Sequence, residues 1–293
     1  MDLTASAEPA AASWQVSLGR LSPQNFARLA KFIEGYAGIK MPPSKATMLE
    51  GRLHKRVRAR GMANLDEYCR YLFDRDGMQA EVVHLIDAVS TNKTDFFREP
   101  EHFRILQGAV LPELLGHRRA AGARLTVWSA ACSTGAEPYT LAMVLAEFGR
   151  EHPPLQAGIV ATDINTEVLA TARRGVYPED HVAPVPAALR QRYLLRSRDG
   201  ARRLVRVAPE LRAMVRFGRL NLMAERYEMD GRFDIVFCRN VLIYFHRETQ
   251  LHVLQRLCAH LRSGGYLFLG HSESITGLSL PLAAAGQNVF RRT

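Results

Sequence analysis

Polar side chains follow three short apolar runs of this sequence, and their types suit a ligand that carries a ribose and a base. Asp163 ends one run, and an acid at that place can accept hydrogen bonds from ribose hydroxyls. Asn240 lies just beyond the run 233–238 and offers both a donor and an acceptor, which suits an adenine edge or a carboxylate. Asn221 follows the stretch 215–220, so we expect it at the same edge of a sheet.

Glu137 is the charged group of the segment 129–139, whose small residues would let the backbone approach a ligand. It lies in the opening turn of a helix that Pro138 is set to begin. Two other readings stay open at this stage. Glu137 could simply complement the helix dipole, and Asp163 could cap the helix that begins near residue 165, alone or in addition to binding a ribose.

The segment 91–98 is dense in polar groups and lies upstream of these runs. It carries three side chains that could cover a ligand and two aromatic rings that could anchor the loop, namely Asn92, Thr94, Arg98, Phe96 and Phe97. The alternative is a capped turn with a surface arginine.

Apolar runs alternate with helical stretches from residue 124 onward. The expected strands are 125–129, 159–162, 233–238 and 266–269, and the expected helices lie near 137–149, 165–174 and 247–262. This alternation is typical of a doubly wound α/β domain with a largely parallel sheet, which we place at 91–293. The stretches 204–207 and 214–217 alternate with period 2 and predict a small antiparallel insertion over about 197–218.

Residues 21–90 are predicted to form a small helical domain, preceded by a flexible Ala/Ser-rich leader over 1–20. Its first helix opens at Ser22-Pro23, an N-cap followed by proline at the first helical position. A helix over about 45–60 has an apolar stripe and a basic remaining surface, formed respectively by Ala46, Leu49, Leu53, Val57 and by Lys45, Arg52, Lys55, Arg56, Arg58. That basic face is either an ordinary solvated surface or a docking site for an acidic partner.

The composition indicates a globular protein with an acidic partner. The net charge of +10 suits nucleic acid, an anionic membrane surface or an acidic protein, and does not choose between them. The sequence shows no apolar stretch near the ~20 residues of a membrane span and no secretory signal, so we expect a cytoplasmic location without membrane insertion. The four cysteines are scattered, and we expect reduced thiols and no metal site.

At these residues the sequence resembles the CheR family of chemotaxis-receptor glutamate methyltransferases. The similar segments are 91–99 (family style N-x-T-x-F-F-R-E), 130–139, 161–165, 221–222, 237–245 (F-C-R-N-V-x-I-Y-F) and 270–274. They run in the family's order from about residue 22 to 290. The resemblance implies a class I S-adenosylmethionine-dependent methyltransferase fold, Rossmann-like, with a small antiparallel β insertion and an all-helical N-terminal domain that recognises the receptor.

The resemblance also implies the ligands and their residues. The cofactor would be S-adenosylmethionine, with S-adenosylhomocysteine as product, held by Asn92, Thr94, Arg98, Glu137, Asp163, Asn221, Leu222, Asn240 and Val241. Asp163 would hold the ribose and Glu137 would face the methionyl or sulfonium end. The substrate would be glutamates on the cytoplasmic methylation helices of membrane chemoreceptors, approached by Arg52, Lys55, Arg56 and Arg58.

Three positions depart from the family's pattern. Ala136 and His246 stand where many relatives carry an acid, but neither replaces an expected ligand. The segment 197–203 has one glycine, whereas relatives that dock a receptor C-terminal pentapeptide are often richer in glycine there. This departure makes docking of a receptor pentapeptide on this segment doubtful.

A glutamate carboxylate is ionised at neutral pH and needs no general base to attack a sulfonium methyl, so the expected catalysis is by positioning. Arg98 is the expected group that orients the carboxylate or the cofactor, with Tyr244 near the site.

The same chemistry could serve a receptor of a pathway other than motility. A nucleic-acid methyltransferase lacks support, because no Asn/Asp-Pro-Pro-Tyr signature or RNA-binding module occurs. A nicotinamide dehydrogenase would need the missing Gly-x-Gly-x-x-Gly turn, and a regulator without catalysis is the third alternative.

Overall fold

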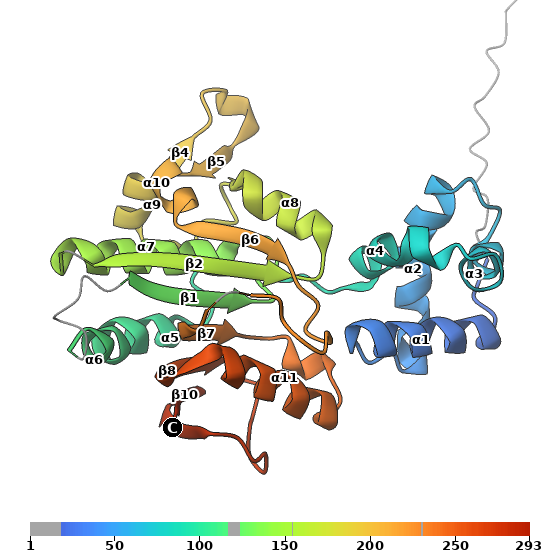
Figure 1. The fold of residues 1–293 in the computed structure, drawn as a ribbon. Helices are drawn as coiled ribbons and strands as arrows, with labels where there is room; N and C mark the ends of the chain where they lie inside the picture. Colours follow the sequence, from blue (N-terminus) through green and yellow to red (C-terminus); the bar gives the residue numbers. More distant parts are fainter. Residues whose placement is uncertain (1–18, 117–123, 154, 230) are drawn as a thin grey trace, which may run out of the picture.

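The structure is a computed structural model, and it describes residues 19–116, 124–153, 155–229 and 231–293. The expected leader, residues 1–20, lies almost wholly outside the described residues. No helix in the described ranges is long and apolar enough to cross a membrane. Figure 1 shows two parts, a helical bundle formed by the N-terminal residues and a larger α/β part formed by the rest.

The helical part consists of α1 (Pro23–Ala37), the 3-10 turn η1 (Pro43–Lys45), α2 (Ala46–Ala59), α3 (Leu65–Asp74) and α4 (Met78–Val89). Ser22 caps α1 by accepting a hydrogen bond from the Asn25 amide, as its sequence predicts. Three of the four residues of the predicted apolar stripe of α2 are buried: Leu49, Leu53 and Val57 have no exposed surface and join one core with residues of α1, α3 and α4, whereas Ala46 is half-buried. This part has its own hydrophobic core.

The α/β part is built on a seven-stranded sheet with the order β6-β2-β1-β7-β8-β10-β9. Its strands are β1 (Arg124–Ala130), β2 (Gln156–Asp163), β6 (Val215–Arg219), β7 (Phe233–Cys238), β8 (Leu261–Leu269), β9 (Leu282–Gly286) and β10 (Val289–Arg292). Strands β6, β2, β1, β7 and β8 run parallel, and β10 is antiparallel to both of its neighbours. The order reverses between β1 and β7, where doubly wound sheets bind ligands.

Helices cover both faces of this sheet. They are α5 (Pro100–Ile105), the π-helical η2 (Leu106–Val110), α6 (Leu111–Gly116), α7 (Ala136–Glu151), α8 (Thr166–Arg174), α9 (Ala187–Tyr193), α10 (Pro209–Ala213) and α11 (Arg247–His260). Alternate strand residues enter two cores: Val127 and Phe237 pack in the core that contains α5 to α7, whereas Trp128 and Val236 pack in the core that contains α11. The predicted doubly wound domain is confirmed.

The small antiparallel sheet exists, but its predicted bounds of about 197–218 are wrong. It consists of β3 (Val176–Pro178), β4 (Leu194–Arg196) and β5 (Leu204–Val207), in the order β3-β5-β4. In the stretch 214–217, expected as its second strand, residues 215–217 belong instead to β6, which pairs in parallel with β2 in the main sheet. Period-2 alternation marks a strand that has one buried face, and it does not say which sheet the strand joins.

The helical part lies beyond the carboxyl ends of the parallel strands, where the arrowheads of β2 and β6 point in Figure 1. Asp87 of α4 accepts hydrogen bonds from the Thr166 amide (2.7 Å) and hydroxyl (2.5 Å) at the start of α8. The Asn221 side-chain amide donates to the Tyr36 carbonyl at 2.7 Å. These contacts fix the helical part against the edge of the sheet at which the candidate residues end.

Candidate functional site

A pocket lies between the two parts, at the carboxyl ends of β1, β2, β6 and β7. All nine residues that the resemblance assigned to the cofactor line it, as does Tyr244: Asn92, Thr94, Arg98, Glu137, Asp163, Asn221, Leu222, Asn240 and Val241. The helical part contributes Ala37, Ile39, Met41, Lys45, Met48 and Val89. The predicted residues are therefore brought together, and the helical part forms one wall.

The turn after β1 lets the backbone approach the pocket. Ala131 and Ser133 have left-handed φ values of 58° and 51°, and Gly135 (φ 95°) precedes α7. A side chain at Gly135 would come within 2.9 Å of the Ala172 Cβ and the Tyr177 hydroxyl, so only glycine fits this close approach. Strained backbone of this kind is common at ligand sites.

Asp163 ends β2 and its side chain is hydrogen-bonded to the turn after β1. It accepts hydrogen bonds from the Ser133 amide at 2.8 Å and the Asn165 amide at 2.9 Å. Burial raises the pKa of its carboxyl, and these amides act in the opposite direction. The cap of α8 is Asn165, which accepts from the Val168 amide, so the alternative reading of Asp163 as that cap is wrong.

Glu137 lies in the first turn of α7, but it does more than complement the helix dipole. It accepts a hydrogen bond from the Ser129 hydroxyl at 2.7 Å and pairs with Arg239 at 3.1 Å. Burial raises the pKa of its carboxyl, and the Arg239 charge opposes that rise. Its second oxygen is thus tied to Arg239, the residue after β7, and both side chains line the pocket.

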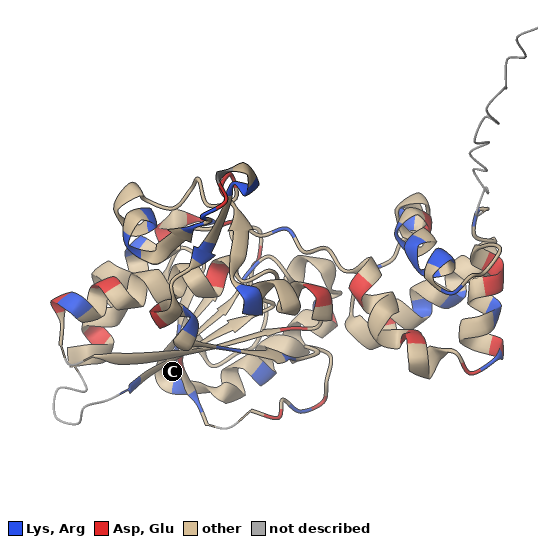
Figure 2. Ribbon diagram, turned by 90° about the horizontal axis from the view of Figure 1, so that it is seen from above, with Lys and Arg blue, Asp and Glu red and all other residues tan. Residues whose placement is uncertain are grey.

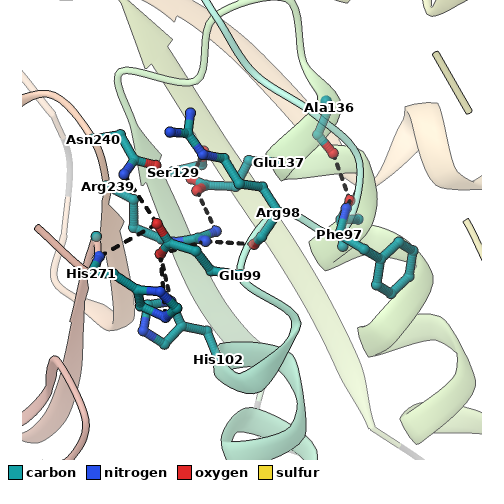
Figure 3. A network of polar contacts seen from close by, with 12 residues as sticks. Phe97, Arg98, Glu99, His102, Ser129, Ala136, Glu137, Arg239, Asn240 and His271 are labelled. Carbon is teal, nitrogen blue, oxygen red and sulfur yellow. Dashed lines mark hydrogen bonds and ion pairs between the residues drawn. The ribbon is translucent and has the colours of Figure 1, made fainter. Parts of the chain in front are cut away.

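Arg239 is the centre of a buried ion network that Figure 3 shows from close by. Its guanidinium is 2.9 Å from the Glu99 carboxylate, 3.1 Å from Glu137 and 2.5 Å from the Arg98 carbonyl, and its side chain is 2% exposed. Although burial opposes it, the Arg239 hydrogen bond lowers the pKa of Glu99 to about 2. The network therefore joins β7, α7 and the end of the segment 91–98.

The Asn240 backbone is held in a left-handed conformation (φ 58°) by Glu273. The Glu273 carboxylate accepts hydrogen bonds from the amides of Asn240, Val241, Leu242 and Gly270, at 3.0, 2.9, 2.7 and 2.6 Å. A Cβ at Gly270 would lie 2.8 Å from the Asn240 amide nitrogen, so the close approach requires glycine. The Asn240 side chain donates to Glu99 at 3.1 Å.

Of the two readings of the segment 91–98, the loop beside a ligand site agrees with the structure, in which Asn92, Thr94 and Arg98 line the pocket. The ring of Phe96 is buried and makes an edge contact with Tyr177, 5.1 Å between ring centroids, while the Phe97 amide donates to Thr140 at 3.1 Å. The Asn92 carbonyl accepts a hydrogen bond from the Ser133 hydroxyl at 2.7 Å. Arg98 is half-buried and donates to the Lys93 carbonyl at 3.1 Å. The aromatic rings anchor the loop, and the polar residues face the pocket.

Lys and Arg residues, blue in Figure 2, occur in both parts of the protein. The four basic residues assigned to the substrate fall into two groups by their contacts. Arg56 pairs at 2.7 Å with Glu81, which is fully buried, and Arg52 donates to the carbonyls of Val89 and Ser90. Both are therefore occupied within the helical part. Lys55 and Arg58 are exposed, and Lys55 makes one loose surface contact with Glu167 at 3.4 Å.

Glu99, His102 and His271 come close enough to resemble a metal site, with ligand atoms within 4.8 Å of one another. The Glu99 carboxylate, however, already accepts hydrogen bonds from Arg239, Asn240 and the His271 amide. Burial lowers the pKa of His102 to about 4, and the Arg239 charge acts in the same direction. A positive guanidinium on the same oxygen disfavours a cation, so we assign the cluster to the ion network.

Sequence reasoning missed three residues that organise the site: Arg239, Glu99 and Glu273. Each stood in a segment that carried the resemblance. Glu99 and Glu273 do not line the pocket, and Arg239, which does, is paired with two carboxylates of the protein. The available signal was chemical, because charged residues inside apolar segments are almost never buried unless they are paired. Their partners lie far away in the chain, so spacing did not identify them.

Comparisons with known proteins agree with this geometry. The family model "CheR methyltransferase, SAM binding domain" matches residues 92–289, and "CheR methyltransferase, all-alpha domain" matches residues 24–90. A chemotaxis protein methyltransferase of Salmonella typhimurium is 39% identical, with 92% of this chain and 90% of the relative covered. Chemotaxis protein methyltransferase 1 of Pseudomonas aeruginosa is 40% identical over 84% and 89%, and a relative of Borreliella burgdorferi 37% over 88% and 90%.

Proposed function

Since this chain belongs to the CheR methyltransferase family, we propose that it methylates specific glutamate side chains on the cytoplasmic helices of chemoreceptors. Membership makes it an S-adenosylmethionine-dependent methyltransferase of chemotaxis with a class I fold. The choice of glutamates, the receptor as partner and a cytoplasmic location are parts of the proposal. The observation that carries it is the inter-part pocket, in which a cofactor-binding edge faces a wall of the helical part.

The pocket residues fit S-adenosylmethionine. Asp163, at the end of β2, is placed to accept hydrogen bonds from ribose hydroxyls, and Leu222 with Ile164 offers apolar surface for a base. Asn240 and Val241 line the part of the pocket at the end of β7. When bound, the cofactor supplies a sulfonium methyl, which a carboxylate oxygen accepts as the S–CH3 bond breaks and its electron pair stays on sulfur, leaving S-adenosylhomocysteine.

The protein's own residues act by positioning, because the acceptor carboxylate is already ionised and no proton has to move. Glu137 and Glu99 neutralise Arg239. This buried guanidinium therefore holds the loop 91–98 in place and does not bind the carboxylate of the cofactor or the substrate. Arg98 keeps a half-buried guanidinium at the pocket, where it orients a carboxylate of the cofactor or the substrate. The helical part excludes water from one side.

Lys55 and Arg58 are the part of the predicted basic face that remains exposed to a partner. A glutamate-rich receptor helix is acidic. Positively charged surface side chains guide such a partner into its correct position more than they raise its affinity. Arg52 and Arg56 support this face from within the fold. The small sheet β3-β5-β4 is not assigned a receptor pentapeptide.

The test is to incubate the purified protein with radiolabelled S-adenosylmethionine and receptor-containing membranes, then treat the product with mild base. Base-labile label on the receptor band supports a carboxyl methyl ester. Base-stable label on the receptor, or label transferred to nucleic acid instead, would contradict the proposal. Cofactor binding without any transfer to the receptors of chemotaxis would direct the search to a receptor of another pathway.

A further inference from the structure

Several positively charged side chains line the pocket, and their contacts indicate that they have different roles. Arg239 is neutralised by two carboxylates. Arg98 and Lys93 belong to the loop 91–98 over the pocket, and the Lys93 carbonyl accepts a hydrogen bond from the Arg98 guanidinium. Lys45 comes from the opposite wall, at the junction of η1 and α2. In the part of the chain that the structure describes, Lys45 forms no ion pair with a carboxylate.

The Lys45 ammonium is held in place without being saturated. It donates one hydrogen bond to the Lys40 carbonyl at 2.9 Å and lies 5.9 Å from the centroid of the Tyr244 ring. An ammonium has three N–H donors, so two remain for another acceptor. Lys45 is half-buried, and burial together with the charges of Arg52 and Lys40 lowers its pKa, while Glu34 opposes them. An anion at this place would relieve that unfavourable charge.

We propose that Lys45 binds the carboxylate of the acceptor glutamate beside Tyr244. This inference rests on the proposed function and names a substrate-binding residue for it. One carboxylate oxygen accepts hydrogen bonds from the ammonium, and the other oxygen is left to form the new bond to the methyl carbon. Lys45 itself forms and breaks no covalent bond. The helical part thus supplies a contact with the reacting group as well as a docking surface.

The ion pair between Lys45 and the acceptor carboxylate also affects product release and specificity. A carboxylate that enters the pocket loses water, and the unpaired ammonium replaces part of that hydration. A methyl ester or a glutamine amide carries no charge, so each loses the ion pair with Lys45. The enzyme is therefore expected to bind an unmethylated glutamate more tightly than its own product.

The test compares Lys45→Met with the matched control Lys31→Met, an exposed lysine on α1 that does not line the pocket. Two soluble cytoplasmic fragments of a chemoreceptor from the same genome serve as probes, one with glutamates and one with glutamines at the acceptor positions. Calorimetry in the presence of S-adenosylhomocysteine gives fragment affinities, and steady-state kinetics give kcat/KM. Cofactor affinity is measured separately.

For Lys45→Met we expect kcat/KM for the glutamate fragment to fall about 10- to 100-fold, which corresponds to about 1.4 to 2.8 kcal/mol at 1.4 kcal/mol per factor of ten. Cofactor affinity should stay within about twofold. The wild type should prefer the glutamate fragment over the glutamine fragment, and Lys45→Met should lose that preference. Lys45→Arg should retain part of it, and Lys31→Met should match the wild type.

Unchanged kcat/KM in Lys45→Met, or a preference for the glutamate fragment that survives in it, would overturn the assignment. The assignment would also be overturned if Lys93→Met lost the preference for the glutamate fragment while Lys45→Met kept it. A wild-type protein that methylates no glutamate fragment and no receptor would overturn the proposed function itself, and Lys45 with it. The two failures are distinguishable, because the first leaves the wild type active.

Discussion

Arg239 at the end of β7 lies between Glu99 and Glu137, with its guanidinium nitrogens 2.9 Å and 3.1 Å from the two carboxylates. All three side chains are almost wholly buried. Removing one member of such a group leaves uncompensated charge in the interior, which costs more than an exposed ion pair contributes.

Replacement of Arg239 by methionine should therefore lower the free energy of unfolding by about 3–5 kcal/mol, since two buried carboxylates lose their counter-charge. Cofactor binding should fall with it, because the Arg98 carbonyl also loses its donor. Denaturant unfolding and calorimetry measure the two effects. The control is Arg196→Met, whose side chain is 84% exposed and should change stability by less than about 0.5 kcal/mol. Equal stability of both variants would show that the network is not a structural support.

Arg98→Ala tests the expected orienting group. Its guanidinium makes a hydrogen bond to the Lys93 carbonyl and no ion pair among the described residues, so the fold should persist. Methyl transfer should fall by about a hundredfold or more, as positioning effects commonly do. Turnover and thermal unfolding are compared with the wild type. Near-normal turnover would remove Arg98 from the mechanism.

The basic residues of α2 should separate into two classes. Arg56→Glu places a like charge beside buried Glu81, so the helical part should lose about 3–5 kcal/mol of stability. The double variant Lys55→Glu/Arg58→Glu should keep its stability to within about 1 kcal/mol, because both side chains are exposed, and it should weaken receptor methylation at low salt. Stability and methylation are measured for both. Unaltered methylation in the stable double variant would contradict receptor docking on this face.

Glu273→Gln should disturb the site without touching the pocket. Four backbone amides donate to this carboxylate, and a glutamine presents an N–H group to some of them. We expect a loss of about 1–3 kcal/mol of stability and weaker cofactor binding, since Asn240 and Val241 lose their anchor. Unfolding curves and calorimetry check both. Full cofactor affinity in the variant would show that the loop holds its shape without Glu273.

The low pKa of Glu99 makes stability depend on acid pH. Its folded pKa is about 2 against an ordinary 4.5, so the folded state binds fewer protons than the unfolded state between these values. This contribution to stability is complete above about pH 4.5 and is lost as the pH falls towards 2. Denaturant unfolding at a series of pH values should show a shallower decline in Glu99→Gln than in the wild type. Parallel profiles would mean that Glu99 titrates normally.

The sequence by itself determined the strand ends and the residues that stand there. Short apolar runs mark central strands, and a polar residue at the end of such a run has to lie at the sheet edge, which is why Asp163 and Asn240 were found. The amphipathic spacing of α2 likewise predicted its buried stripe correctly. These are local properties, since they depend on neighbours a few residues apart.

Only the tertiary structure decided which polar groups pair. The partners of Arg239 come from two other elements, Arg56 is occupied by Glu81 of α4, and Lys45 reaches Tyr244 across the boundary of the two parts. The stretch 214–217 looked like part of an antiparallel hairpin, yet its residues 215–217 pair in parallel with β2. Such contacts depend on how distant elements pack, and a local pattern of hydrophobic and charged residues carries no information about the identity of a distant partner.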